Sequence, residues 1–334
     1  MAEQLSGSDA PVVVVDVLGG DNGHDVVLTG IDLALAADPR VEVLACGPAQ
    51  IVDVFASTRP RVQALHATQN IEMNEHPASA VRAKKDSTIV VGCKAVKEGR
   101  AQGFFSAGST GACLAGATLF IGRIRGISRP ALCHVIPSPA GNVVMSDIGA
   151  NADCKPEWLV QFAQMATVYA EKIVGKEHPS VALLNIGSED TKGSQFAQEC
   201  HQVLKDNLPN FAGNAEGGDL VCAKYDVVVT DGFTGNVALK TLEGTSKELL
   251  KAVKGVMMSN LATKLGALAM KRGLNGLKTR MSADTYGGAP LLGVNGVCLI
   301  GHGNSNPEAI KSGILATARM IEANLVEEIV KVVK

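Results

Sequence analysis

Small polar residues follow five apolar segments of this 334-residue chain, and their types suit the binding of an anion. The loops read DVLGGD at residues 16–21, SAGSTGA at 106–112, DIGANAD at 147–153, NIGSED at 185–190 and TDGFTGN at 230–236. Most run into a helical pattern, and helix N-termini offer free N–H groups and a partial positive charge to phosphate or to a developing oxyanion. Tight turns and caps explain any one loop, whereas five loops of the same composition indicate a ligand site.

Lys192 and Asn236 are the side chains in these loops that could act on a substrate. Lys192 lies six residues past the predicted strand end at Ile186 and offers a compact positive charge to phosphate or to an oxyanion. Asn236 opens a helical pattern, and its amide could donate to an acyl carbonyl. Each has a structural alternative, because Lys192 could be a solvated lysine and Asn236 a helix cap.

Hydroxyl and carboxyl groups accompany these two residues. At the start of a helical pattern, phosphate could be bound through hydroxyl and backbone N–H groups, with simple capping as the alternative, by Ser106, Ser109 and Thr110. The acids expected to orient donors or to cap helices are Asp16, Asp153 and Asp231. Of the histidines, His302 lies in the Gly-rich loop 301–306 and is a functional candidate, with turn packing as the alternative. His134 lies inside an apolar run, and we interpret it as a hydrogen-bonded core histidine.

The elements that must position these residues alternate between short apolar runs and longer helical patterns. Several runs are apolar at every position, which is typical of strands covered on both faces. We predict strands at residues 12–16, 41–45, 88–91, 104–107, 131–136, 143–148, 181–186, 226–230 and 296–300. We predict helices at residues 25–37, 49–57, 111–121, 157–174, 194–207, 235–270 and 306–332. This alternation indicates an α/β fold with a mostly parallel sheet, in which ligands bind outside the carboxyl ends of the strands.

Several common catalytic motifs are absent from the sequence. It has no P-loop, no G-x-S-x-G nucleophile elbow and no H-E-x-x-H zinc motif. The nearest dinucleotide fingerprint, GHGNSN at residues 301–306, has asparagine at the third glycine position and enters the last helix rather than a first βαβ unit. A phosphate or thioester chemistry without a metal or a covalent intermediate fits these absences.

Composition bounds the class of protein. Hydrophobic residues make up 46% and charged residues 19% of the chain, which excludes global disorder. Aromatic residues make up 4% and the net charge is −2, so a nucleic-acid partner is not expected. The eight scattered cysteines are typical of small buried residues in a reducing compartment. Without a signal peptide or an apolar run of about 20 residues, we expect a soluble, cytoplasmic protein with a disordered leader at 1–10 and a single domain at 11–334.

Residues 244–280 form a basic segment within this domain. Eight basic residues and one acid, Glu248, give it a net charge of +7, although the whole chain carries −2. Apolar residues recur at spacings of three and four, which predicts an amphipathic helix. The apolar stripe could face the core or a second copy of the chain. An acidic protein or an anionic membrane surface could dock on the basic side chains, the candidates being Lys264, Lys271, Arg272, Lys278 and Arg280.

The longer motifs identify the chain with a family. DIGANADCKP at residues 147–156, LNIGSEDTKG at 184–193, VTDGFTGNVALK at 229–240 and the segment 286–305, with the loops at 16–21 and 106–112, together resemble the bacterial PlsX phosphate acyltransferases. The similarity is collinear from Val12 to the last helix. The family usually has D-A-M-G-G-D where this chain has DVLGGD, and asparagine where this chain has Ser109, which leaves that residue's contact open.

The resemblance implies an activity, a fold and a site. The reaction is acyl-[acyl carrier protein] plus inorganic phosphate to acyl phosphate plus free carrier protein, which feeds glycerol-3-phosphate acylation. The fold is a doubly wound α/β/α sandwich similar to phosphotransacetylases and isopropylmalate dehydrogenases, in a homodimer without cofactor or metal. Peripheral membrane contact and a glycerol-3-phosphate acyltransferase partner are also implied. Lys192 and Asn236 become the catalytic candidates, and the phosphate- or substrate-binding candidates are Asp16, Gly19, Gly20, Ser106, Ser109, Thr110, Asn151, Asp153, Asp231, Thr234 and His302.

Two other classes of function compete with this interpretation. A dehydrogenase of the isopropylmalate type would need a divalent metal held by clustered acids, a nicotinamide site and an arginine-rich carboxylate clamp, of which the clamp is not evident. A non-catalytic scaffold that binds membranes through the basic segment would leave the five polar loops unexplained.

Overall fold

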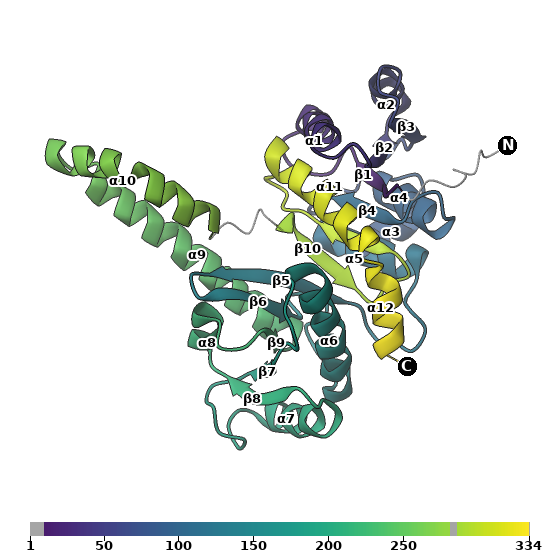
Figure 1. The fold of residues 1–334 in the computed structure, drawn as a ribbon. Helices are drawn as coiled ribbons and strands as arrows, with labels where there is room; N and C mark the ends of the chain where they lie inside the picture. The colour runs from purple at the N-terminus through teal and green to yellow at the C-terminus, as the bar shows by residue number, and fades with distance from the viewer. Residues whose placement is uncertain (1–9, 281–285, 334) are drawn as a thin grey trace.

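One sheet of 11 strands runs through the computed structural model, which describes residues 10–280 and 286–333 (Figure 1). The strand order is β3-β2-β1-β4-β11-β10-β5-β6-β9-β7-β8. The strands are β1 Val12–Asp16, β2 Glu42–Gly47, β3 Val62–His66, β4 Gly103–Ser106, β5 Ala131–Ser138, β6 Gly141–Ser146, β7 Val181–Leu184, β8 Phe211–Ala215, β9 Val227–Val229, β10 Ala289–Leu292 and β11 Val297–Ile300. Of the leader expected at 1–10, residues 1–9 lie outside the described residues.

The sheet is mostly parallel but reverses direction near its middle. β1 pairs in parallel with β2 and β4, and β11 with β4. β10 is antiparallel to β11 and β5, and β5 is antiparallel to β6. Since β9, β7 and β8 follow the direction of β6, this half of the sheet runs opposite to β1. The polar loops therefore leave the sheet in two groups, one after β1, β4 and β11 and the other after β6, β7 and β9.

Helices cover both faces of the sheet, as the uninterrupted apolar runs predicted. On β1, Val13 and Val15 belong to one buried core, and Val12 and Val14 belong to the other. The first face is packed by α1 His24–Ala37, α2 Ala49–Ala56, α6 Pro156–Tyr169, α7 Gln195–Asn207, α11 Pro307–Glu322 and α12 Leu325–Val332. The second is packed by α3 Pro77–Ala83, α4 Thr88–Lys97, α5 Thr110–Gly116, α8 Gly217–Cys222 and the start of α9 Gly232–Met257. The three-layer α/β arrangement is confirmed.

The strand predicted at residues 88–91 is wrong, because this segment opens α4. Ser87 caps the helix by accepting from the Val90 N–H at 3.4 Å. Ile89, Val90 and Cys93 are all buried, so the segment lacks the polar face that usually distinguishes a helix. The sequence analysis also did not find α3, α8, β3, β8 and β10. Single turns of π-helix, η1 Ala117–Ile121 and η2 Ala170–Val174, extend α5 and α6 over the lengths predicted.

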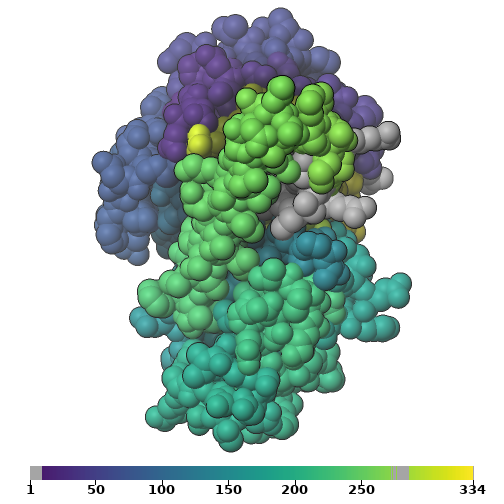
Figure 2. Space-filling view, turned by 90° about the vertical axis from the view of Figure 1, so that its left-hand side faces the viewer, coloured from purple at the N-terminus to yellow at the C-terminus, as the bar shows by residue number. Residues whose placement is uncertain are grey.

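The basic segment forms a helical hairpin rather than part of one helix over 235–270. α9 ends at Met257, and α10 Leu261–Arg280 returns along it (Figure 1). In Figure 2 the green hairpin points toward the viewer, in front of the junction between the purple-blue and teal parts of the chain. The apolar stripe does not face the core, because Leu249, Val256, Leu261, Leu265 and Leu268 are exposed. The side chains of Arg272, Lys278 and Arg280 lie outside the described part.

The described helices include none that is long and apolar enough to cross a bilayer.

The contact between α1 and α11 gives a test of the packing. A Cβ at Gly30 would lie 2.4 Å from the Ile310 Cβ, so Gly30→Ala should lower the free energy of unfolding by about 1–3 kcal/mol through overpacking. Gly244, inside α9, has nothing within 4 Å of such a Cβ. Gly244→Ala is therefore the control, and it should leave stability unchanged or raise it by up to about 1 kcal/mol. Urea unfolding measures both, and equal effects would contradict this packing.

Candidate functional site

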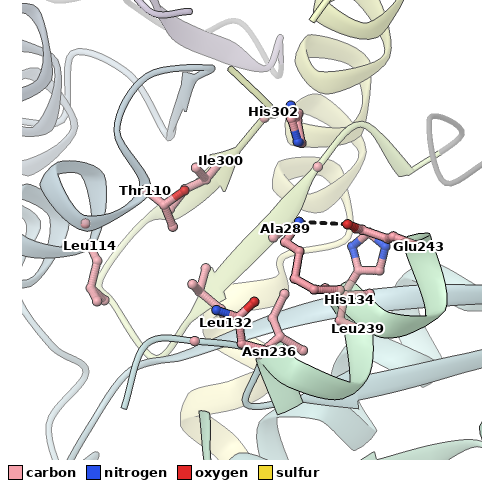
Figure 3. Close-up of a pocket in the computed structure, with 16 residues that line it drawn as sticks. Thr110, Leu114, Leu132, His134, Asn236, Leu239, Glu243, Ala289, Ile300 and His302 are labelled. Atoms are coloured by element: carbon pink, nitrogen blue, oxygen red, sulfur yellow. Dashed lines mark hydrogen bonds and ion pairs between the residues drawn. The ribbon is translucent and has the colours of Figure 1, made fainter. Parts of the chain in front are cut away.

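A cavity of about 370 Å³ lies between the two groups of polar loops (Figure 3). Its floor comes from β5, β10 and β11, one wall from α5, and the opposite wall from α9 and the loop after β6. The lining is Thr110, Gly111, Leu114, Leu132, His134, Ile148, Gly149, Asn236, Leu239, Lys240, Glu243, Gly288, Ala289, Ile300, Gly301 and His302. An apolar floor with a few polar groups at its margins suits a ligand that has an apolar chain and a polar reacting end.

The loop after β6 is built around the carboxylate of Asp147, which is 0% exposed. It accepts hydrogen bonds from the backbone N–H groups of Gly149, Ala150 and Asn151 in its own loop. It also accepts from the Asn151 side-chain amide at 2.9 Å and from the Leu132 N–H on β5 at 3.0 Å. Burial raises the pKa of Asp147, while these donors act in the opposite direction by favouring the carboxylate.

Helix α9 begins in direct contact with this loop. Asp231 caps the helix, with its carboxylate accepting from the Thr234 N–H at 2.8 Å and from the Thr234 hydroxyl at 2.7 Å. A Cβ at Gly235 would lie 1.9 Å from the Asp147 carbonyl oxygen, so only glycine allows the approach. Asp147 and Gly235 thus set the position of Asn236, the next residue of α9.

One face of α9 carries the polar groups of the cavity. Asn236, Leu239, Lys240 and Glu243 have the spacing of neighbours on one helix face, and all four line the cavity. The Lys240 ammonium donates to the Glu243 carboxylate at 2.7 Å, as the dashed line in Figure 3 marks. The Asn236 amide makes no hydrogen bond with another residue of the described chain. It therefore faces the cavity with its donors free.

His134 lines the cavity and is not the hydrogen-bonded core histidine that we expected. It shares one face of β5 with Leu132, and its ring lies beside Glu243 in Figure 3. Burial lowers its pKa, which Glu243 opposes and Lys240 reinforces. Within the described residues its ring has no hydrogen-bond partner. Near neutral pH it is therefore an uncharged imidazole that can donate or accept one hydrogen bond.

The loops after β1 and β4 depend on a second buried carboxylate. Asp16 is 1% exposed and accepts from the Ser106 hydroxyl at 2.7 Å and the Leu18 N–H at 3.1 Å. Ser106 in turn accepts from the Gly108 N–H at 3.0 Å. Burial raises the pKa of Asp16 despite these donors. Both side chains are buried beneath the loop and bonded to each other, and their contact with a substrate stays a prediction.

Three other candidates lie near this second carboxylate. Ser109 caps α5 by accepting from the Ala112 N–H at 3.4 Å, which agrees with the capping alternative. A Cβ at Gly19 would lie 2.9 Å from the Asp16 carboxylate, so the glycine permits a close turn. Thr110 follows the cap and lines the cavity.

The loop that carries His302 packs on the loop after β1. The Asp21 N–H donates to the Gly303 carbonyl at 2.8 Å, and Gly20, with φ +104°, lies against the same oxygen. His302 is exposed, and its Nδ1 accepts from the Asn304 N–H at 3.2 Å. Its neutral form then carries the proton on Nε2, where it can be donated to a ligand in the cavity.

Several predicted residues lie elsewhere. Lys192 does not line this cavity; its ammonium lies 3.8 Å from the Glu189 carboxylate, and its side chain is 49% exposed. Asp153 and Asp231 line a separate cavity of about 390 Å³ on the other side of the α9 start, with Phe196 and Phe233. The amide of Asn151 holds the loop internally by donating to the Pro130 carbonyl at 2.8 Å. Of the two catalytic candidates, Asn236 lines the cavity of about 370 Å³ and Lys192 does not.

The cavity also contains residues that sequence reasoning did not select. Lys240 and Glu243 follow the motif around Asn236 at helical spacing, so an amphipathic analysis of that motif could have found them. The apolar lining, from Leu114 to Ile300, comes from five separate elements and gives no local signal. Among the described residues no group of three or more His, Cys, Asp or Glu side chains could hold a metal ion. The amide of Asn236, the hydroxyl of Thr110, the imidazole of His134 and the ammonium of Lys240, which is paired with Glu243, can bind and polarise a substrate.

Comparison with known proteins places the chain among acyltransferases. A family model described as "Fatty acid synthesis protein" matches residues 12–328. A phosphate acyltransferase from Desulfitobacterium hafniense is 44% identical over 323 residues, covering 96% of each chain. A phosphotransacetylase from Streptococcus pyogenes has a similar fold, with a TM-score of 0.60 at 16% identity over 95% of this chain and 94% of that one. A 4-hydroxythreonine-4-phosphate dehydrogenase from Klebsiella pneumoniae gives a TM-score of 0.51 at 12% identity over 94% and 100%.

The buried carboxylate of Asp147 can be tested by an isosteric change. Asp147→Asn removes the charge and turns an N–H₂ group toward N–H donors, so the free energy of unfolding should fall by at least about 3 kcal/mol. Asp153→Asn, an exposed change in the same loop, should stay within about 0.5 kcal/mol of the parent. Chemical denaturation compares the two, and a similarly small loss in both variants would contradict the role assigned to Asp147.

Proposed function

Because the chain belongs to the fatty acid synthesis protein family, we propose that it is a phosphate acyltransferase that converts acyl-[acyl carrier protein] and inorganic phosphate to acyl phosphate and free carrier protein. The product feeds glycerol-3-phosphate acylation in phospholipid synthesis. The observation that carries this conclusion is the 44% identity to a phosphate acyltransferase over 96% of both chains. No comparable identity supports a dehydrogenase, because the 4-hydroxythreonine-4-phosphate dehydrogenase reported above is similar in fold at 12% identity.

The cavity supports this reaction chemically. An oxygen of phosphate attacks the thioester carbonyl carbon, a C–O bond forms and the C–S bond breaks. The proton of hydrogen phosphate passes to the thiolate of the carrier, so the reaction needs no added proton. Apolar side chains such as Leu132, Leu239 and Ile300 suit the acyl chain, and the free amide of Asn236 suits the carbonyl oxygen. Positioning two reactants and stabilising an oxyanion can supply much of the rate.

The finer parts of the proposal concern partners. The exposed apolar side chains on α9 and α10 support a homodimer contact, because contiguous apolar patches usually mark interaction sites. The lysines of the same hairpin support docking of an acidic carrier protein or peripheral contact with an anionic membrane. We further propose a glycerol-3-phosphate acyltransferase as the partner that takes up the acyl phosphate. We propose no nucleic-acid partner.

The purified protein tests the reaction directly. It should release thiol from a long-chain acyl carrier protein only when phosphate is present, with acyl phosphate as the product. A chelator should leave the rate unchanged. A thiol reagent follows release, and mass spectrometry identifies the product. Equal thiol release without phosphate would show a hydrolase instead.

Asn236 and Lys192 are the proposed oxyanion donors. Asn236→Ala and Lys192→Ala should each lower the turnover number by about 10²- to 10³-fold, the usual cost of one such donor. Circular dichroism and unfolding should change little, because both side chains are exposed. Steady-state kinetics measures the effect. Since Lys192 does not line the cavity beside Asn236, near-parental turnover in Lys192→Ala alone would leave Asn236 as the donor and return Lys192 to a solvated surface role.

The basic hairpin should act on association rather than on chemistry. Charge reversal at Lys264 and Lys271 should raise the KM for acyl carrier protein and weaken its salt dependence, because exposed charges are screened over about 8 Å. Lys97→Glu, an exposed change in the last turn of α4, is the control. Kinetics at several salt concentrations and co-sedimentation with anionic liposomes separate the partners. Lost liposome binding with unchanged carrier kinetics would assign the hairpin to lipid, and no change in either would make it a solvated face.

A further inference from the structure

Among the described residues that line the cavity beside Asn236, Lys240 supplies the only lysine or arginine side chain. It lies one helical turn beyond Asn236 on the same face of α9, so the ammonium and the amide open onto one space. Inorganic phosphate carries up to two negative charges into this space. Of the other polar groups in the lining, Glu243 is an anion, and neither the Thr110 hydroxyl nor the imidazole of His134, whose pKa is lowered by burial, supplies a positive charge.

In this structure the Lys240 ammonium forms an ion pair with the Glu243 carboxylate. The two side chains meet at 2.7 Å, with 57% of Lys240 and 44% of Glu243 exposed. Such a pair contributes little to stability, because solvent screens it and two long side chains lose freedom. The Glu243 carboxylate instead marks a place for an anion. Its oxygen accepts from the Lys240 ammonium as a phosphate oxygen would.

We propose that Lys240 binds the attacking phosphate and that Glu243 is the anion which phosphate displaces from it. This inference rests on the proposed function, since it assigns a residue to one of its substrates. Glu243 then sets the phosphate affinity in two ways. It competes for the Lys240 ammonium, and its charge repels the incoming dianion.

The proposal separates the two substrates. Lys240→Met should raise the KM for phosphate by about 10- to 100-fold, as expected for one charge-assisted hydrogen bond, with the KM for acyl carrier protein within about twofold. Glu243→Gln should lower the KM for phosphate, because the competing carboxylate is gone. Lys240→Arg keeps the charge and should lose less than Lys240→Met.

The matched control is the second lysine–glutamate pair of the same helix. Lys251 lies 3.5 Å from Glu248, also three residues apart, and neither residue lines the cavity. Lys251→Met should leave the KM for phosphate unchanged, and it is a control for phosphate binding alone because Lys251 belongs to the basic hairpin. A readout without turnover is the rise in unfolding temperature that inorganic phosphate alone produces, which should be lost in Lys240→Met, kept in Lys251→Met and enlarged in Glu243→Gln.

The outcomes of these experiments distinguish a failure of this inference from a failure of the proposed function. Failure of the parent protein to release thiol with phosphate would overturn the function itself. A parent that turns over, together with a Lys240→Met variant whose phosphate KM and phosphate-induced stabilisation match those of Lys251→Met, would overturn the role of Lys240. An increase in phosphate KM in Glu243→Gln would overturn the displacement by phosphate.

Discussion

The site depends on one buried carboxylate, that of Asp147. It takes no charged partner among the described residues and is held instead by backbone N–H groups of its own loop, by the Asn151 amide and by the Leu132 N–H of β5. A buried charge is stable only when its hydrogen-bonding capacity is filled, so the loop has little freedom to take another path. Because the Asp147 carbonyl also touches Gly235, the same loop fixes where α9 begins. The position of the polar face of α9 follows from that contact.

Asp16 is the buried carboxylate that orders the loops in the other half of the sheet. Because strand direction reverses between the halves, Asp16 and Asp147 order loops that leave opposite edges of the sheet. Asp16 is the last residue of β1 and orders the loop after β4 through Ser106, whereas Asp147 follows β6, which runs in the opposite direction. A doubly wound sheet of uniform direction would put all the polar loops at one edge. Here the antiparallel strands β10 and β5 lie between two ordered loop groups and supply the apolar floor. The cavity is therefore apolar along its length and polar where the loops approach.

The sequence predicted the parts of this arrangement that are local. Loop composition located Asp16, the cap at Asp231 and the residue Asn236, because each depends on neighbours within a few positions. Asp147 lay in a predicted loop but was not selected, since its burial and its bond to Leu132 depend on packing against β5. The helix at residues 88–91 was missed because a run buried on every side has no periodicity to read. The strand reversal was missed for two reasons: the tight turn that makes β5 and β6 an antiparallel hairpin was not recognised, and β10, which pairs with β5, is far away along the chain. His134 was interpreted as a core residue because the sequence does not show how α9 lies relative to β5, and that arrangement decides the exposure of this side chain.

The charged side chains act over two different ranges, a short one in the cavity and a longer one around the basic hairpin. The cavity has one lysine, already opposite a carboxylate, so its own field is weak beyond the first layer of solvent. The excess of basic side chains stands on the α9–α10 hairpin, where Lys247, Lys251 and Lys254 are exposed and act over a Debye length. A small phosphate reaches the cavity by diffusion and needs only a short-range donor there. A large acidic protein gains more from a field that orients it before contact, because orientation limits the rate at which proteins associate. Under the proposed function, separating the two kinds of charge would let the chain attract a protein without holding phosphate so tightly that its transfer becomes unfavourable.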